Sequence, residues 1–200
     1  MGADRLGQPT EASRLGCEEL SLTQVRKYGT IASGFTSDRM YHLVRDEESG
    51  CVRWQLKEVA LPQPLIKHYD AGDPNEWLRS YPDAGRPEDF KFIGCREGNE
   101  IAGLLTWRPV DWNEVLCLID VRVRAGSRGL GVGSALVSAL QNECRRRRLR
   151  GITLETQTSN YPAVAFYFKH GFKIAGFHEY LYANDDMQRA DVALFLFWIS

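Results

Sequence analysis

The sequence predicts a mixed α/β domain, in which a mostly antiparallel central sheet is flanked by helices. Short apolar runs bounded by turn residues recur along the chain, and turn signals join several of them into hairpins. Between residues 115 and 177 a strand, a helix, a strand, a second helix and a strand follow one another. Because hairpins precede this part and a final strand follows it, the sheet cannot be a purely alternating parallel one.

Length and composition fit one domain. The 200 residues are 44% apolar and 11% aromatic, which is enough for a sizeable core. We expect a single domain at residues 17–200, preceded by a poorly ordered polar leader at 1–16. A net charge of −1 argues against a nucleic-acid binder. We expect no membrane partner, since no apolar run approaches the length of a membrane span.

The five cysteines are odd in number, widely spaced and without a CxxC pair. This usage argues against a disulfide framework or a zinc site and favours a reducing cytoplasm. Cys117 and Cys144 lie in apolar patterns, so we interpret both as small buried side chains rather than catalytic thiols. The four histidines show no ligand spacing, and we assign no metal.

The first half of the chain is predicted to hold short elements and one long loop. A strand at 19–22 precedes a helix that Thr23 caps and that runs to about Ile31. Strands at 40–44 and 52–59 meet at a polar turn, and Pro62 and Pro64 then end the pattern. Residues 70–89 form an acidic surface loop, with a short helix at 76–80. The loop would steer a polycationic substrate or is simply solvated.

The second half carries stronger patterns. A hairpin joins 90–95 to 101–107, and the apolar strand 115–123 is predicted to be central with both faces covered. A helix with apolar residues at helical spacing starts near Val132 and reaches the arginines at 145–148, with Gly151 as its stop. A strand at 152–156, a helix from Asn160 to Gly171 and strands at 172–177 and 192–199 follow.

Two surface features of this half have alternative interpretations. We interpret the arginine run as positive charge that stabilises a helix C-terminus, and we favour this over a nucleic-acid-binding site. Trp107 and Trp112 either wall a substrate pocket or pack in the core and loops.

A glycine-punctuated turn joins the central strand to its helix. Gly129, Gly131 and Gly133 leave backbone N–H groups open at a helix start, where the helix dipole favours an anion. Arg128 adds a positive charge. The spacing matches neither a P-loop nor a dinucleotide fingerprint. We interpret the turn as a site for a pyrophosphate.

Two motifs resemble signatures of the GNAT superfamily of acyl-CoA-dependent N-acetyltransferases. The first is Arg128-x-x-Gly131-x-Gly133. The second is Asn160-x-x-Ala163-x-x-Phe166-Tyr167-x-x-x-Gly171-Phe172, one strand later. Within the superfamily, the chain resembles the streptothricin acetyltransferases, which acetylate a β-lysine amine. That likeness is carried by residues 34–36, 56–59, 112–113, 120–123, 154–157, 181–182 and 193–195.

The resemblance implies a cofactor site for acetyl-CoA. Backbone groups at Val121 and Val123 would bond the pantetheine arm, and Asn160 with Ala163 would contact the cofactor near Tyr167. The pyrophosphate would be wrapped by Arg128, Gly129, Gly131, Val132, Gly133 and Ser134.

Acetyl transfer to an amine needs three groups. The amine arrives as an ammonium ion, so a base must take its proton. The oxyanion needs an N–H donor, for which we propose a backbone group near Val121. The leaving thiolate needs a donor, and Tyr167 is the candidate. Asp120, which interrupts an apolar strand, and Glu155, near the end of the next strand, are both candidates for the base and the amine site.

The sequence therefore predicts direct acetyl transfer from acetyl-CoA to a small cationic amine, by preference of streptothricin type and giving resistance to it. Two alternatives stay open: another amine, such as a polyamine, amino acid or peptide, or a CoA-binding module without catalysis. The oligomeric state is open, with a homodimer among the alternatives.

Overall fold

The computed structural model of the chain describes residues 15–28, 31–69 and 89–200. Seven strands form one sheet in the order β1-β4-β5-β6-β7-β9-β8, and β2 pairs with β3 in a separate ribbon. The seven are β1 (Gly16–Leu20), β4 (Lys91–Glu97), β5 (Glu100–Val110), β6 (Val115–Val123), β7 (Gly151–Gln157), β8 (Lys173–His178) and β9 (Ala193–Ile199). Only the β6–β7 pair is parallel among these described strands, which confirms the predicted mostly antiparallel sheet.

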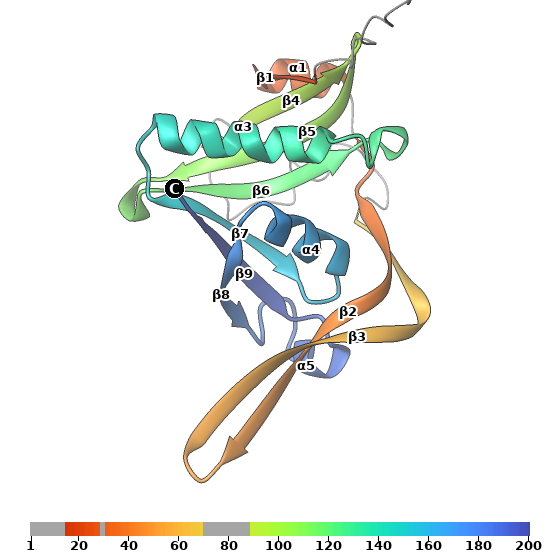
Figure 1. The fold of residues 1–200 in the computed structure, drawn as a ribbon, viewed down its shortest axis with the longest axis vertical. Coiled ribbons are helices and arrows are strands. Elements are labelled where there is room, and N and C mark those ends of the chain that lie inside the picture. The colour runs from red at the N-terminus through yellow and green to blue at the C-terminus, as the bar shows by residue number, and fades with distance from the viewer. Residues whose placement is uncertain (1–14, 29–30, 70–88) are drawn as a thin grey trace, which may run out of the picture.

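The helices cover both faces of the sheet (Figure 1). Helix α3 (Val132–Arg146) and helix α4 (Tyr161–Lys169) share one apolar core with the sheet, in which Leu136, Leu140 and Leu116 are fully buried. Helix α1 (Leu22–Tyr28) contributes Val25 to a second cluster with Phe92. Helices α3 and α4 lie on one face because both pack into the core that contains Leu116, as expected when the crossovers β6–α3–β7 and β7–α4–β8 run in the same direction along the sheet.

Three helix boundaries show how local chemistry sets the elements. The predicted cap Thr23 is wrong, because Ser21 caps α1: its Oγ accepts the Gln24 N–H, and the Gln24 side chain accepts the Ser21 N–H in return. Asn160 caps α4 as predicted, accepting the Ala163 N–H at 3.2 Å. Gly171, at φ +83°, follows the C-terminus of α4, also as predicted.

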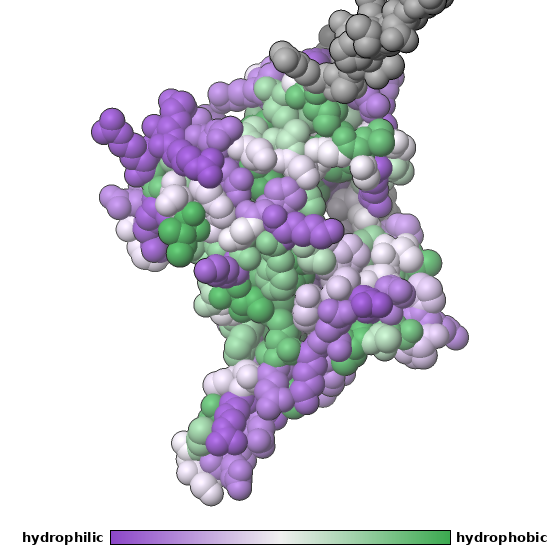
Figure 2. Space-filling view, in the orientation of Figure 1, coloured by the Kyte–Doolittle hydropathy of each residue, from purple (hydrophilic) through white to green (hydrophobic). Residues whose placement is uncertain are grey.

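Gly151 does not stop helix α3, contrary to the prediction. The helix ends at Arg146, and Arg148 turns the chain with φ +56°. Gly151 instead begins β7, where a Cβ would lie 2.2 Å from the Trp198 carbonyl oxygen. The glycine is therefore required by close packing of β7 against β9. The arginines at 145–148 are exposed (Figure 2).

The ribbon of β2 (Gly34–Glu48) and β3 (Cys51–His68) projects from the body (Figure 1). The turn at 49–50 was predicted, but both strands are longer than expected. Pro62 and Pro64 do not end β3. The register jumps from Arg39–Ala60 to Ser37–Leu65, so both prolines lie in a bulge, where no ladder hydrogen bond is required of them.

Two sequence predictions lie outside the described residues. These are the leader, apart from Leu15 and Gly16, and the acidic loop at 70–89, apart from Asp89. Strand β1 begins at Gly16, one residue before the predicted domain start. No helix in the described ranges is long and apolar enough to cross a membrane.

Candidate active site

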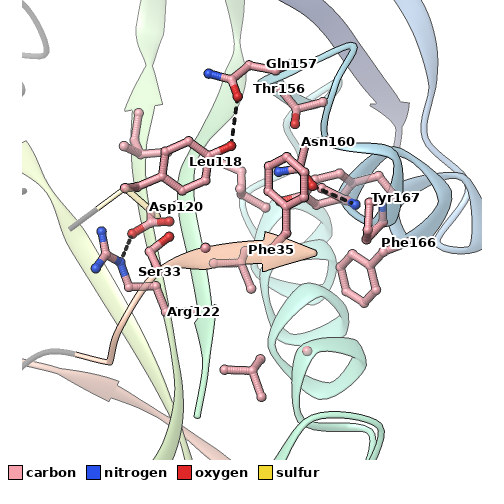
Figure 3. A pocket seen from close by; sticks show the side chains of 18 of the residues that line it. Ser33, Phe35, Leu118, Asp120, Arg122, Thr156, Gln157, Asn160, Phe166 and Tyr167 are labelled. Carbon is pink, nitrogen blue, oxygen red and sulfur yellow. Dashed lines mark hydrogen bonds and ion pairs between the residues drawn. The ribbon is translucent and has the colours of Figure 1, made fainter. Parts of the chain in front are cut away.

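The site lies where β6 and β7 part. Their ladder ends at the Leu118–Leu154 pair, although both strands continue. On its other edge β6 stays paired with β5. There Leu118 pairs with Trp107 and Asp120 pairs with Thr106, so Ile119 between them is a bulge residue without a partner on β5. Such a bulge bends the strand. A cavity of about 830 Å³ opens beside the separated strands (Figure 3).

Val121 and Val123 present backbone groups to this cavity. The Arg124 N–H bonds the Ala102 carbonyl of β5, so the Val123–Gly103 pair is one whose own N–H and C=O groups point away from β5. The same alternation turns the Val121 backbone to the cavity. A strand edge without a partner is suited to an extended polar chain such as a pantetheine arm.

The glycine loop leaves the N-terminus of α3 open. Gly129 and Gly131 have φ +78° and +88°, and Gly131 occupies the N-cap without a side-chain cap. The backbone N–H groups of Val132, Gly133 and Ser134 therefore remain for an anion, where the helix dipole also favours negative charge. The Val132 side chain itself is buried in the core.

Arg128 and Gly133 line the cavity. The Arg128 guanidinium donates to the Val123 carbonyl at 3.2 Å and to the Gly34 carbonyl at 3.3 Å. A Cβ on Gly133 would lie 3.2 Å from the Phe166 ring. Glycine at this position therefore lets α3 and α4 approach beside the cavity.

Tyr167 is the buried phenol of the site. Its ring packs edge-on against Phe166 and Phe172, with centroids 5.3 and 5.5 Å away, and the residue is 8% exposed. Burial raises the Tyr167 pKa, and the nearby carboxylates of Asp120 and Glu155 raise it further. The phenol therefore keeps its proton at neutral pH and can act as a donor. Ala163 and Asn160, about one and two turns earlier, also line the cavity.

Asp120 lines the cavity but is held by an ion pair. Its carboxylate accepts from Arg122 Nε, and this arginine side chain is 4% exposed. The same guanidinium donates to the Ile31 carbonyl at 3.1 Å. The ion pair, marked by a dashed line in Figure 3, therefore balances a buried charge, and the bond to Ile31 ties the segment before β2 to the central strand.

Glu155 lies across the gap on β7. Its side chain is exposed at the cavity, while protein groups on its other sides exclude water. This desolvation raises the Glu155 pKa, and a hydrogen bond from the Tyr182 hydroxyl opposes the rise. Asp191 raises it further. Both predicted carboxylates thus face one cavity with Tyr167.

Sequence comparison decides the family. A profile of the acetyltransferase (GNAT) family matches residues 39–172, more than half of the chain. The chain belongs to the GNAT acetyltransferase family. It is therefore an acyltransferase that takes its acetyl group from acetyl-CoA, as the two motifs predicted.

Relatives of this GNAT protein include streptothricin acetyltransferases. The enzyme of Escherichia coli is 30% identical over 59% of this chain and 67% of its own length. That of Streptomyces lavendulae is 30% identical over 64% and 67%. The fold matches nourseothricin acetyltransferase, with a TM-score of 0.73 at 22% identity over 92% of this chain and 98% of the other.

A Bacillus anthracis acetyltransferase solved in complex with acetyl coenzyme A also matches this GNAT fold. Its TM-score is 0.69 at 23% identity, over 93% of this chain and 99% of the other.

The first half of the GNAT chain adds a wall that the sequence did not assign to the site. Phe35 at the start of β2, and Ser33 and Tyr69 just outside the β2–β3 ribbon, line the cavity. The Tyr69 hydroxyl donates to Gln157 Oε1 at 2.8 Å. Lys67, two residues earlier, donates to Asp191 at 2.7 Å and also bonds Gln157 and Ser159. The resemblance at residues 34–36 was the one available signal for this wall.

Two tryptophans contribute nothing to the cavity, contrary to one of their two interpretations. Trp107 is 2% exposed in the core under α3, and Trp112 is 86% exposed on a short helix at Asp111–Asn113. Cys144 is buried as predicted, whereas Cys117 is half-buried. Among the described residues, no group of three or more His, Cys, Asp and Glu could hold a metal.

Proposed function

We propose that this acetyltransferase transfers acetyl directly to a primary amine of a cationic substrate, of the streptothricin type. The observation that carries the proposal is the convergence of Tyr167 and Glu155 on one cavity beside the open edge of β6. The streptothricin acetyltransferases among the relatives favour this substrate class. Transfer would proceed without a covalent enzyme intermediate.

The cofactor residues follow from the strand edge and the helix start. Val121 and Val123 would bond the pantetheine arm through their backbone groups, as a strand bonds a neighbour. The pyrophosphate would lie at the N-terminus of α3, close to the positive charge of Arg128. Asn160 would contribute its amide N–H₂, because its side-chain oxygen already caps α4.

Three groups would divide the chemistry. Glu155 would take a proton from the acceptor ammonium, directly or through water, so that the neutral amine attacks the thioester carbonyl. A backbone N–H at Val121 would stabilise the developing oxyanion. When the carbon–sulfur bond breaks, the nitrogen of the adduct would release its remaining excess proton to water, and the thiolate would leave with a hydrogen bond from the Tyr167 hydroxyl.

Glu155 is the better base of the two carboxylates. Asp120 already bonds the buried guanidinium of Arg122, which holds its negative charge in place. The ion pairs found in the described residues do not include Glu155, whose hydrogen bond comes from the neutral hydroxyl of Tyr182. Desolvation raises the Glu155 pKa toward neutrality, which suits a base that exchanges protons with an amine.

A thiol-release assay with a panel of amines tests the acceptor. Purified protein and acetyl-CoA are mixed with streptothricin, spermidine, lysine or a short peptide, and mass spectrometry locates the acetyl group. Turnover highest on streptothricin, with one acetyl on its β-lysine amine, supports the proposal. Turnover confined to another amine replaces the substrate class. Binding of CoA without turnover on any amine favours the non-catalytic module.

A further inference from the structure

The loop after β8 returns to the site and brings a second phenol to Glu155. The Tyr182 hydroxyl donates to Glu155 Oε1, although 27 positions separate the two residues. Tyr182 is 39% exposed, whereas Tyr180 on the same loop is 56% exposed. The Tyr182 hydroxyl therefore reaches inward to the carboxylate that we assign as the base.

Buried contacts fix this loop in place. The Tyr182 N–H bonds Asp186 Oδ2 at 2.9 Å, and Asp186 is 1% exposed. Its other carboxylate oxygen, Oδ1, has no hydrogen-bond partner within the described part of the chain. Asp191 follows, with its N–H on the Asp186 carbonyl and its carboxylate on Ser159 and Lys67. A buried carboxylate is destabilising unless it accepts hydrogen bonds. The bond from the Tyr182 N–H to Asp186 therefore favours a single position of this loop.

The hydrogen bond from Tyr182 orients the Glu155 carboxylate and favours its ionised form. A donor to one oxygen restricts rotation of the group and leaves the second oxygen for another partner. It also favours the ionised form, against the desolvation that raises the Glu155 pKa. The titratable groups that interact with Glu155 include Tyr182, Asp191, Tyr69, Tyr167 and Cys117. Asp191 is the neighbouring charge that raises the Glu155 pKa, and the Lys67 ammonium engages it. Arg108 lies against Cys117. The Tyr182 hydroxyl acts in the opposite direction to desolvation and Asp191.

We propose that Tyr182 is a positioning residue: it holds Glu155 Oε1 and leaves Oε2 to the acceptor ammonium, while the Asp186 carboxylate fixes the Tyr182 backbone. This inference rests on the proposed role of Glu155 as the base. Tyr182 neither gains nor loses a proton during transfer. Its loss would leave the acetyl-CoA site unchanged, since it does not line the cavity beside β6.

Tyr182→Phe tests the inference, with Tyr180→Phe as the matched control. The pH dependence of kcat/KM for the acceptor is measured for both variants, using whichever amine the panel identifies. For Tyr182→Phe we expect the acid limb to move up by about one pH unit, so that kcat/KM falls about tenfold at pH values below the wild-type limb. KM for acetyl-CoA stays constant, and Tyr180→Phe follows the wild type. An unmoved acid limb overturns the inference.

Two further measurements separate this inference from the proposed function. In a Glu155→Gln background, Tyr182→Phe should have little additional effect on turnover, because the carboxylate that it positions is absent. An additive effect contradicts the inference. Carbon-13 NMR of labelled glutamates, with Glu155→Gln for assignment, should show a higher Glu155 pKa in Tyr182→Phe without any substrate. This titration tests the contact between Tyr182 and Glu155 even if no amine in the panel is acetylated. An unchanged Glu155 pKa in Tyr182→Phe overturns the inference.

Discussion

Replacing Tyr167 by Phe isolates the donor to the leaving thiolate. The ring packs against Phe166 and Phe172 and its residue is 8% exposed, so Phe preserves the packing while no bulk water replaces the lost hydroxyl. A hydrogen bond to a charged group contributes about 1.5–3 kcal/mol. Since 1.36 kcal/mol corresponds to tenfold in rate, we expect the transfer step to slow roughly 10- to 150-fold.

Single-turnover thiol release measures this step apart from product release. The acetyl-CoA dissociation constant should stay within about twofold, and the thermal midpoint within about 2 °C, because no packing is lost. Tyr161→Phe, on the same helix but outside the cavity lining, serves as the control and should retain the wild-type rate. An unchanged single-turnover rate for Tyr167→Phe would refute the role of Tyr167 as donor.

Three other changes test the remaining parts of the site. Because the Glu155 pKa is raised and the ionised form is the active one, kcat/KM should fall as pH drops through this raised pKa, and a pH–rate series should show no such limb in Glu155→Gln. Asp120→Asn removes the charge partner of the buried Arg122 guanidinium, so urea denaturation should show a loss of about 3 kcal/mol, whereas Glu155→Gln should change stability by less than about 1 kcal/mol. Gly133→Val adds a side chain whose first carbon would lie 3.2 Å from the Phe166 ring, so we expect a stability loss of about 1–3 kcal/mol. Calorimetric titration should show acetyl-CoA binding weakened about tenfold or more. Unaltered binding would contradict the placement of the cofactor at the α3 N-terminus.

Local patterns predicted the second half of the fold well. The strand at 115–123 and the helix that Asn160 caps follow from signals within a few residues of each element. The predictions for Gly151, Pro62 and Pro64 were wrong, because contacts with residues distant in the sequence determine the structure at these positions. Gly151 is required by the approach of the Trp198 backbone, and Pro62 and Pro64 are tolerated because the partner strand is out of register there.

The sequence by itself determined the family, the acetyl donor and three residues that share one cavity. It could do so because the glycine loop and the capped helix are local motifs with fixed backbone requirements. Tertiary structure decided how the two carboxylates differ: Arg122 engages Asp120, while a hydroxyl from a loop 27 positions away bonds Glu155. These contacts depend on strand order and loop return, for which a linear pattern carries no signal. The physical reason is that a charge partner acts through space, and only the folded chain brings Tyr182 to Glu155.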